Sequence, residues 1–137
     1  MDSFEKYLYW EDIAQYDIDT AESMFKTGRY LYVAFMCQQS IEKLVKGLFV
    51  YYNNEEPLKT HNINLVFKNI NWPDGFEKVH SKSKDYTPFF VKLLAYYIAE
   101  RYPSYKENLS NLMDKNGALE ILKMTKEVFA WLKSLKK

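Results

Sequence analysis

The segment Ala99-Glu100-Arg101-Tyr102-Pro103 places a permanently charged guanidinium beside a proline that stops a helix. Arg101 follows Leu94 by seven residues, so a helix carries both on one apolar stripe. A cation there interacts with the helix dipole, but its alignment with the stripe predicts a specific partner: a buried carboxylate, a phosphate or a second subunit. Tyr102 and Tyr105 add rings that can stack on a base or pack at an interface.

Three more polar residues border apolar helix faces. Asp17 lies three residues after Ala14 on the apolar face of the first expected helix, where a carboxylate must be paired or hydrogen-bonded. It either faces a ligand or Arg101, or reaches water at the edge of that face. Gln38 and Glu42 are one helical turn apart and face the same way, so they form either a binding pair or a solvated flank.

The histidines and the cysteine are the other residues that could do chemistry. His61 lies at a boundary between a loop and a helix, where it acts either as a general base with an orienting partner or as a hydrogen-bonding anchor of the loop. His80 lies in a polar stretch and is predicted to be plain surface. Cys37 falls on a core stripe, and two distant histidines with one such cysteine predict no metal site. We expect no cofactor.

Composition limits the classes of protein that remain. With 47% hydrophobic and 27% charged residues, the 137-residue chain is predicted to fold as one domain over residues 1–137. A formal charge of +1 gives no support to bulk electrostatic binding of nucleic acid or anionic membrane. A single cysteine excludes an intrachain disulfide, the N-terminus does not resemble a signal peptide, and no apolar run approaches a membrane span, so we expect a cytoplasmic protein.

Apolar spacing predicts an all-α, up-and-down bundle of four to five main helices that positions these residues. The first helix is expected from Ser3, as its cap, to Lys26, with Gly28 as a left-handed end. The remaining helices are expected at about 30–52, after a Thr60 cap to about 70, from Pro88 to about 102, and at about 117–135. In the second helix, Lys43 and Lys46 are expected to point away from the apolar stripe.

Four segments, in order, resemble motifs of prokaryotic HEPN domains. Ala14-x-x-Asp17-Ile18-x-x-Ala21 is similar to the first-helix pattern, and Cys37-Gln38-Gln39-Ser40-Ile41-Glu42-Lys43-Leu44-Val45-Lys46-Gly47-Leu48 to the second-helix signature. Pro57-Leu58-Lys59-Thr60-His61-Asn62-Ile63 resembles the Lys-Thr-His-Asp-Leu segment that follows in the family, with Asn62 in place of Asp. The Arg101-Tyr102-Pro103 run resembles the end of a later helix.

The resemblance implies a homodimeric helical bundle that binds nucleotide or RNA, frequently beside a nucleotidyltransferase-fold partner in toxin–antitoxin-like pairs. Many family members are metal-independent ribonucleases, with an Arg followed after four to six residues by a His. Here positions 106 to 109 hold Lys106, Glu107, Asn108 and Leu109, so that His is absent. We therefore assign no catalytic residue and expect Arg101 to contact a phosphate or an interface.

Three hypotheses follow. The first is a non-catalytic module that binds a nucleotide, RNA or a partner protein through a dimer cleft lined by Arg101, Tyr102, Glu42, Gln38, Asp17 and His61. The second is an endoribonuclease with an altered site, in which Arg101 stabilises the phosphate and His61 or Lys106 moves protons. The third is a structural dimerisation or antitoxin partner, in which Arg101 forms an ion pair with Asp17 or Glu42.

Overall fold

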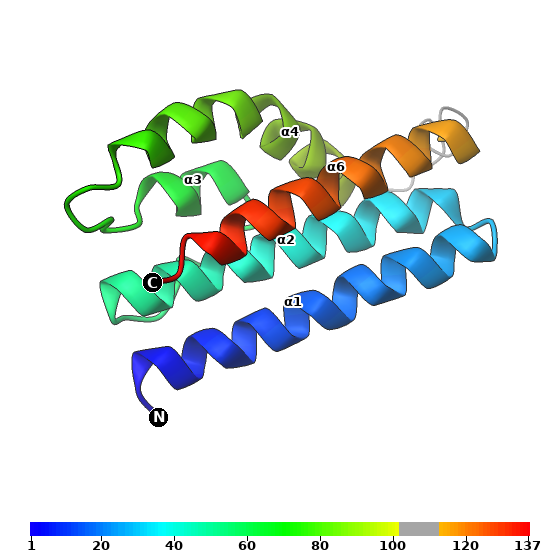
Figure 1. Ribbon diagram of the computed structural model, residues 1–137. Helices are drawn as coiled ribbons and strands as arrows, with labels where there is room; N and C mark the ends of the chain where they lie inside the picture. Colours follow the sequence, from blue (N-terminus) through cyan, green and yellow to red (C-terminus); the bar gives the residue numbers. More distant parts are fainter. Residues whose placement is uncertain (102–112) are drawn as a thin grey trace.

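The computed structural model describes residues 1–101 and 113–137, with side chains at residues 1–76, 85–98 and 113–137. This part of the chain contains helices and turns and no strand, which confirms the predicted all-α bundle. Its helices are α1 (Ser3–Lys26), α2 (Tyr30–Asn53), α3 (Ile63–Lys68), α4 (Glu77–Arg101) and α6 (Lys115–Ser134). In Figure 1, α1 and α6 run alongside α2, while α3 and α4 cover the opposite side of the bundle from α1.

The first two helices form an antiparallel hairpin, as in an up-and-down bundle. Asp2, rather than Ser3, caps α1, because its carboxylate accepts the Glu5 backbone N–H at 2.8 Å. Gly28 has φ +76°, the left-handed conformation expected of the helix end, and the Arg29 N–H donates to the Met24 carbonyl at 2.8 Å. The turn therefore needs only a few residues to return the chain along α1.

Two contacts hold α1 and α2 unusually close. The Ser40 hydroxyl donates to the Ala14 carbonyl of α1 at 2.8 Å. At Gly47, a Cβ atom would lie 2.8 Å from Trp10 Cβ and 3.3 Å from Tyr7 Cδ2, so only glycine fits at this crossing. These contacts fix the register between the helices that carry the candidate site residues.

Helix α2 is the centre of the core. It packs against α1, α3, α4 and α6, and every residue from 44 to 50 is buried. Such a run is not amphipathic, since neighbouring helices pack against it on all sides. The buried run includes Lys46, which corrects the expectation that this lysine points away from the core.

Helix α4 begins at Glu77, eleven residues before the expected start at Pro88. Pro88 lies inside the helix, where its missing N–H removes one backbone hydrogen bond and its ring bends the chain. The helix is visibly curved in Figure 1. Tyr86, which is 6% exposed, packs on Trp131 of α6 at a ring distance of 5.1 Å, and this contact supports the turn before the proline.

The other ends differ from the predictions by one or two residues. Asn62, rather than Thr60, caps α3 by accepting the Leu65 N–H at 3.2 Å, while the Thr60 hydroxyl accepts the Asn62 N–H. Asp114 caps α6, which begins at Lys115. Within residues 1–101 and 113–137, none of the helices is both long and apolar enough for a membrane crossing.

Candidate functional site

A buried carboxylate, that of Glu42, is the centre of a polar cluster inside the bundle. Gln38, Glu42 and Lys46 are spaced by four residues on α2 and therefore share one helix face. Glu42 Oε1 accepts from Gln38 Nε2 at 2.8 Å, and Glu42 Oε2 accepts from Lys46 Nζ at 3.1 Å. The Gln39 amide donates to Gln38 Oε1 at 2.6 Å, which orients the Gln38 amide so that its nitrogen faces the carboxylate.

His61 joins this cluster from the segment that precedes α3. Its Nδ1 lies 2.9 Å from Glu42 Oε1, and its backbone carbonyl accepts from Gln38 Nε2 at 3.5 Å. An ionised carboxylate only accepts hydrogen bonds, so Nδ1 carries the hydrogen and Nε2 is left for other partners. The Glu42 side chain is 6% exposed and that of His61 is 44% exposed. The buried carboxylate of Glu42 thus fixes the position of the His61 ring, which reaches the surface.

Aromatic stacking connects His61 to α4. The rings of His61 and Tyr97 are stacked at 4.0 Å and 25°, and Tyr97 is near-parallel to Phe35 of α2 at 6.3 Å. Stacked flat rings at a partly exposed position are suited to contact with another planar group. Arg101 follows Tyr97 by four residues and is the last residue of α4, so the two positions lie on one face of the helix.

The cluster holds its charge at low solvent exposure. Transfer of Glu42 and Lys46 out of water is unfavourable, and it is offset here by their mutual attraction and by the hydrogen bonds from Gln38 and His61. Because Gln38 and His61 contact Glu42 Oε1 while Lys46 contacts Oε2, both carboxylate oxygens are held and the arrangement allows little rotation of Glu42. The position of the His61 ring is fixed as a consequence.

Asp17 is not part of this cluster. Its carboxylate, 8% exposed, accepts from Lys43 Nζ at 2.6 Å and thereby links α1 to α2. The Asp17 carboxylate is paired, as its position on an apolar face requires, but its partner is a lysine of the neighbouring helix. Of the predicted residues, Gln38, Glu42 and His61 therefore lie together, and Asp17 lies in a separate ion pair.

Two residues of the cluster, Lys46 and Tyr97, were not among the predicted site residues. Lys46 had a visible signal, because it continues the four-residue spacing of Gln38 and Glu42. Tyr97 had none, since it reads as one more apolar position beside Leu94, and its stacking partner is 36 residues away in the chain.

Of the other residues singled out in the sequence, Cys37 is buried in the core, and several lie outside the described part of the structure. Cys37 is fully buried, and burial raises the pKa of its thiol to about 12, which agrees with a core role. Among the described residues, no group of three or more His, Cys, Asp and Glu could hold a metal ion. Tyr102, Tyr105 and Lys106 lie outside the described residues, as do the side chains of Arg101 and His80.

Comparison with known proteins adds the family. A model of the HEPN domain matches residues 7–135. The chain belongs to the HEPN domain family. The crystal structure of TT1696 from Thermus thermophilus has the same fold as this HEPN domain, with a TM-score of 0.73 and 20% sequence identity over 95% of this chain and 98% of that chain. No curated protein sequence matches this chain. Family membership supports a nucleotide-related, RNA-related or nuclease-like role.

Proposed function

We propose that this HEPN domain is a non-catalytic binding module for a nucleotide or an RNA end, with a site formed by Gln38, Glu42, His61, Tyr97 and Arg101. The observation that carries the proposal is the His61 ring, stacked on Tyr97 at 4.0 Å and oriented by the buried Glu42 carboxylate. The rings offer a surface for a base, and Nε2 of His61 offers a hydrogen-bond acceptor.

Arg101 is the proposed phosphate contact. It follows Tyr97 by one helical turn, and a guanidinium matches the geometry of phosphate oxygens. Tyr102 is proposed to contribute a further ring. We also propose that the module acts in the cytoplasm as a homodimer, with its sites near the two-fold cleft, and that its protein partner has a nucleotidyltransferase fold. The absence of a His at positions 106 to 109 supports binding without catalysis.

Isothermal titration with ATP, GTP and a short single-stranded RNA tests the proposal. We expect saturable binding of at least one ligand, weakened about tenfold or more in His61→Ala and Arg101→Ala, since a lost stacking or charged contact is worth about 1–3 kcal/mol. Lys92→Ala is the matched control, because it removes an exposed cation from the same helix. Flat traces with all three ligands would refute the proposal and leave only binding of protein.

A second candidate is an endoribonuclease with an altered site. The Glu42–His61 contact of 2.9 Å favours it, because a carboxylate that orients a surface imidazole resembles a general-base pair. Incubation with total RNA in the presence of a chelator tests this candidate. Cleavage that disappears in both His61→Ala and Arg101→Ala would replace the binding module with the nuclease.

A structural or antitoxin role has less support from the contacts around its two candidate carboxylates. It pairs Arg101 with Asp17 or Glu42, but these carboxylates contact Lys43 and Lys46 respectively. If Arg101→Met lowers the melting temperature and no ligand binds, this role is the one to retain.

A further inference from the structure

An open groove runs between α1 and the C-terminal half of α6. It consists of two hollows of about 530 and 250 Å³ that share Gln15 and Lys133 as lining residues. On α1 the lining extends from Glu5 to Glu22, a helix length of about 26 Å, and Met1 adds to it just before the helix begins. Figure 1 places α1 on the opposite side of the bundle from α3 and α4, so the groove is separate from the Glu42 cluster.

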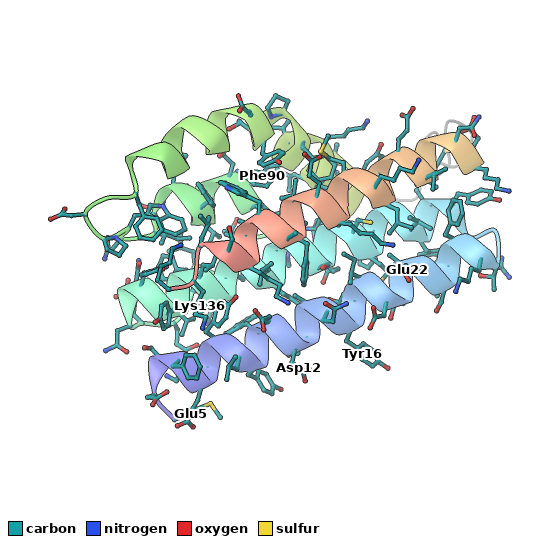
Figure 2. All side chains as sticks on the ribbon, in the orientation of Figure 1. Glu5, Asp12, Tyr16, Glu22, Phe90 and Lys136 are labelled. Carbon is teal, nitrogen blue, oxygen red and sulfur yellow. The ribbon has the colours of Figure 1, made fainter. Side chains whose placement is uncertain are left out.

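The N-terminal half of the groove combines apolar and acidic side chains. Leu8 and Tyr9 are 42% and 63% exposed, a large apolar area for one solvent-facing helix turn. Glu5, Glu11 and Asp12 line the same hollow. Figure 2 shows Glu5, Asp12 and Tyr16 projecting from the side of α1 that no other described helix covers.

The charge of this hollow is only partly neutralised within the part of the chain that the structure describes. Three carboxylates share the hollow with two ammonium groups, those of Lys133 and of the Met1 N-terminus, so the acidic groups outnumber the basic ones by one. No salt bridge to a described residue involves Glu5 or Asp12. The farther hollow differs, because Glu22 forms an ion pair with Lys126. The surplus negative charge therefore coincides with the exposed apolar side chains.

We infer that this groove docks an amphipathic helix of another protein, one that has apolar side chains along one face and lysines or arginines beside them. A groove between two helices accepts a third helix through apolar residues spaced three and four apart, and its acidic border selects basic flanks. A second copy of this chain in a two-fold dimer would place the acidic border against itself, which is unfavourable. The inference is independent of the proposed nucleotide site.

A pair of synthetic helical peptides tests the inference against the full-length protein. The first has about 20 residues, with leucines at helical spacing and lysines beside them; the second has glutamate in place of each lysine. We expect the lysine peptide to bind about tenfold or more tightly than the glutamate peptide by fluorescence anisotropy at low salt, and to weaken as salt rises.

Variants locate the peptide on the protein. Asp12→Lys and, separately, Leu8→Ser are expected to weaken binding of the lysine peptide about fivefold or more. Glu120→Lys has the same charge change at an exposed position of α6 outside the groove, and it should leave binding unchanged. Both α1 residues are exposed, so thermal unfolding of the variants should match that of the wild type.

Three results would overturn the inference. The first is that the two peptides bind with similar affinity, or that neither binds. The second is that Asp12→Lys and Glu120→Lys have the same effect on binding. The third is that sedimentation shows a dimer of this chain that Leu8→Ser dissociates, which would make a second copy the occupant. None of these results bears on ATP or RNA binding at His61, so the two proposals fail separately.

Discussion

Replacement of Glu42 by leucine is the substitution that tests the buried cluster most directly. It leaves Lys46, whose side chain is 11% exposed, without its counter-ion, and it removes the acceptor of Gln38 Nε2 and His61 Nδ1. Removal of one partner from a buried ion pair lowers the free energy of unfolding by about 3–5 kcal/mol. With an unfolding entropy of about 2.1 cal/mol/K per residue over 137 residues, the melting temperature should fall by roughly 10–17 °C.

The assay is urea denaturation followed by circular dichroism, with a double-mutant cycle. Glu42→Leu, Lys46→Met and the double variant are compared with the wild type. Because the double variant buries two apolar side chains instead of an unpaired ammonium, its loss should be smaller than the sum of the single losses by about 1–3 kcal/mol. Glu55→Leu, at an exposed loop position, is the control and should change stability by less than about 0.5 kcal/mol.

The reasoning fails if Glu42→Leu lowers the free energy of unfolding by no more than about 1 kcal/mol, close to the Glu55→Leu control. A buried lysine without its counter-ion should destabilise the fold by more than that. Additive losses in the cycle would also contradict it, because they would mean that Glu42 and Lys46 do not interact.

Three further predictions concern the helix hairpin and the core. Gly47→Ala should lower the free energy of unfolding by about 1–3 kcal/mol in urea, against the usual gain of about 1 kcal/mol in a helix, because Trp10 leaves no room for a methyl group; a gain would contradict the close crossing. Burial raises the pKa of Cys37 from 9.0 to about 12, so the thiol of the unfolded chain loses its proton at lower pH than that of the folded chain. The free energy of unfolding should therefore be unaffected by this thiol below pH 9 and should fall between pH 9 and pH 12 by up to about 1.4 kcal/mol per pH unit. Cys37→Ala should make this fall less steep between pH 9 and 10. Asp17→Asn should lose about 1–3 kcal/mol in the same urea titration, since Lys43 loses a charged acceptor, and an unchanged midpoint would contradict the ion pair.

The fold was predictable from the sequence because most of the signals are local. Apolar spacing placed α1 and α2 within one residue of their observed ends, and Gly28 marked the turn between them. The start of α4 was missed because a polar stretch followed by Pro88 is typical of a helix N-terminus, whereas here tertiary packing of Tyr86 supports a helix that continues through the proline.

The candidate site was predictable only in part. The spacing of Gln38 and Glu42 indicated a shared helix face, but local pattern does not distinguish a solvated face from a buried one when its residues are charged, so the burial of Lys46 was missed. The contacts of Glu42 with His61 and of Asp17 with Lys43 join residues 19 and 26 positions apart, and they depend on how helices pack. The role of each carboxylate therefore required the three-dimensional arrangement.

The burial of α2 on all sides has a consequence for synthesis on the ribosome. Helix α6 covers part of α2, and about 80 residues separate the end of α2 from the end of α6. At about 5–20 residues per second, the ribosome completes α6 roughly 4–16 s after it completes α2. During this interval the mostly apolar run at residues 44–50 lacks its contact with α6. Chains arrested before α6 emerges should therefore be substrates for chaperones and prone to aggregate, although the α1–α2 hairpin is already complete.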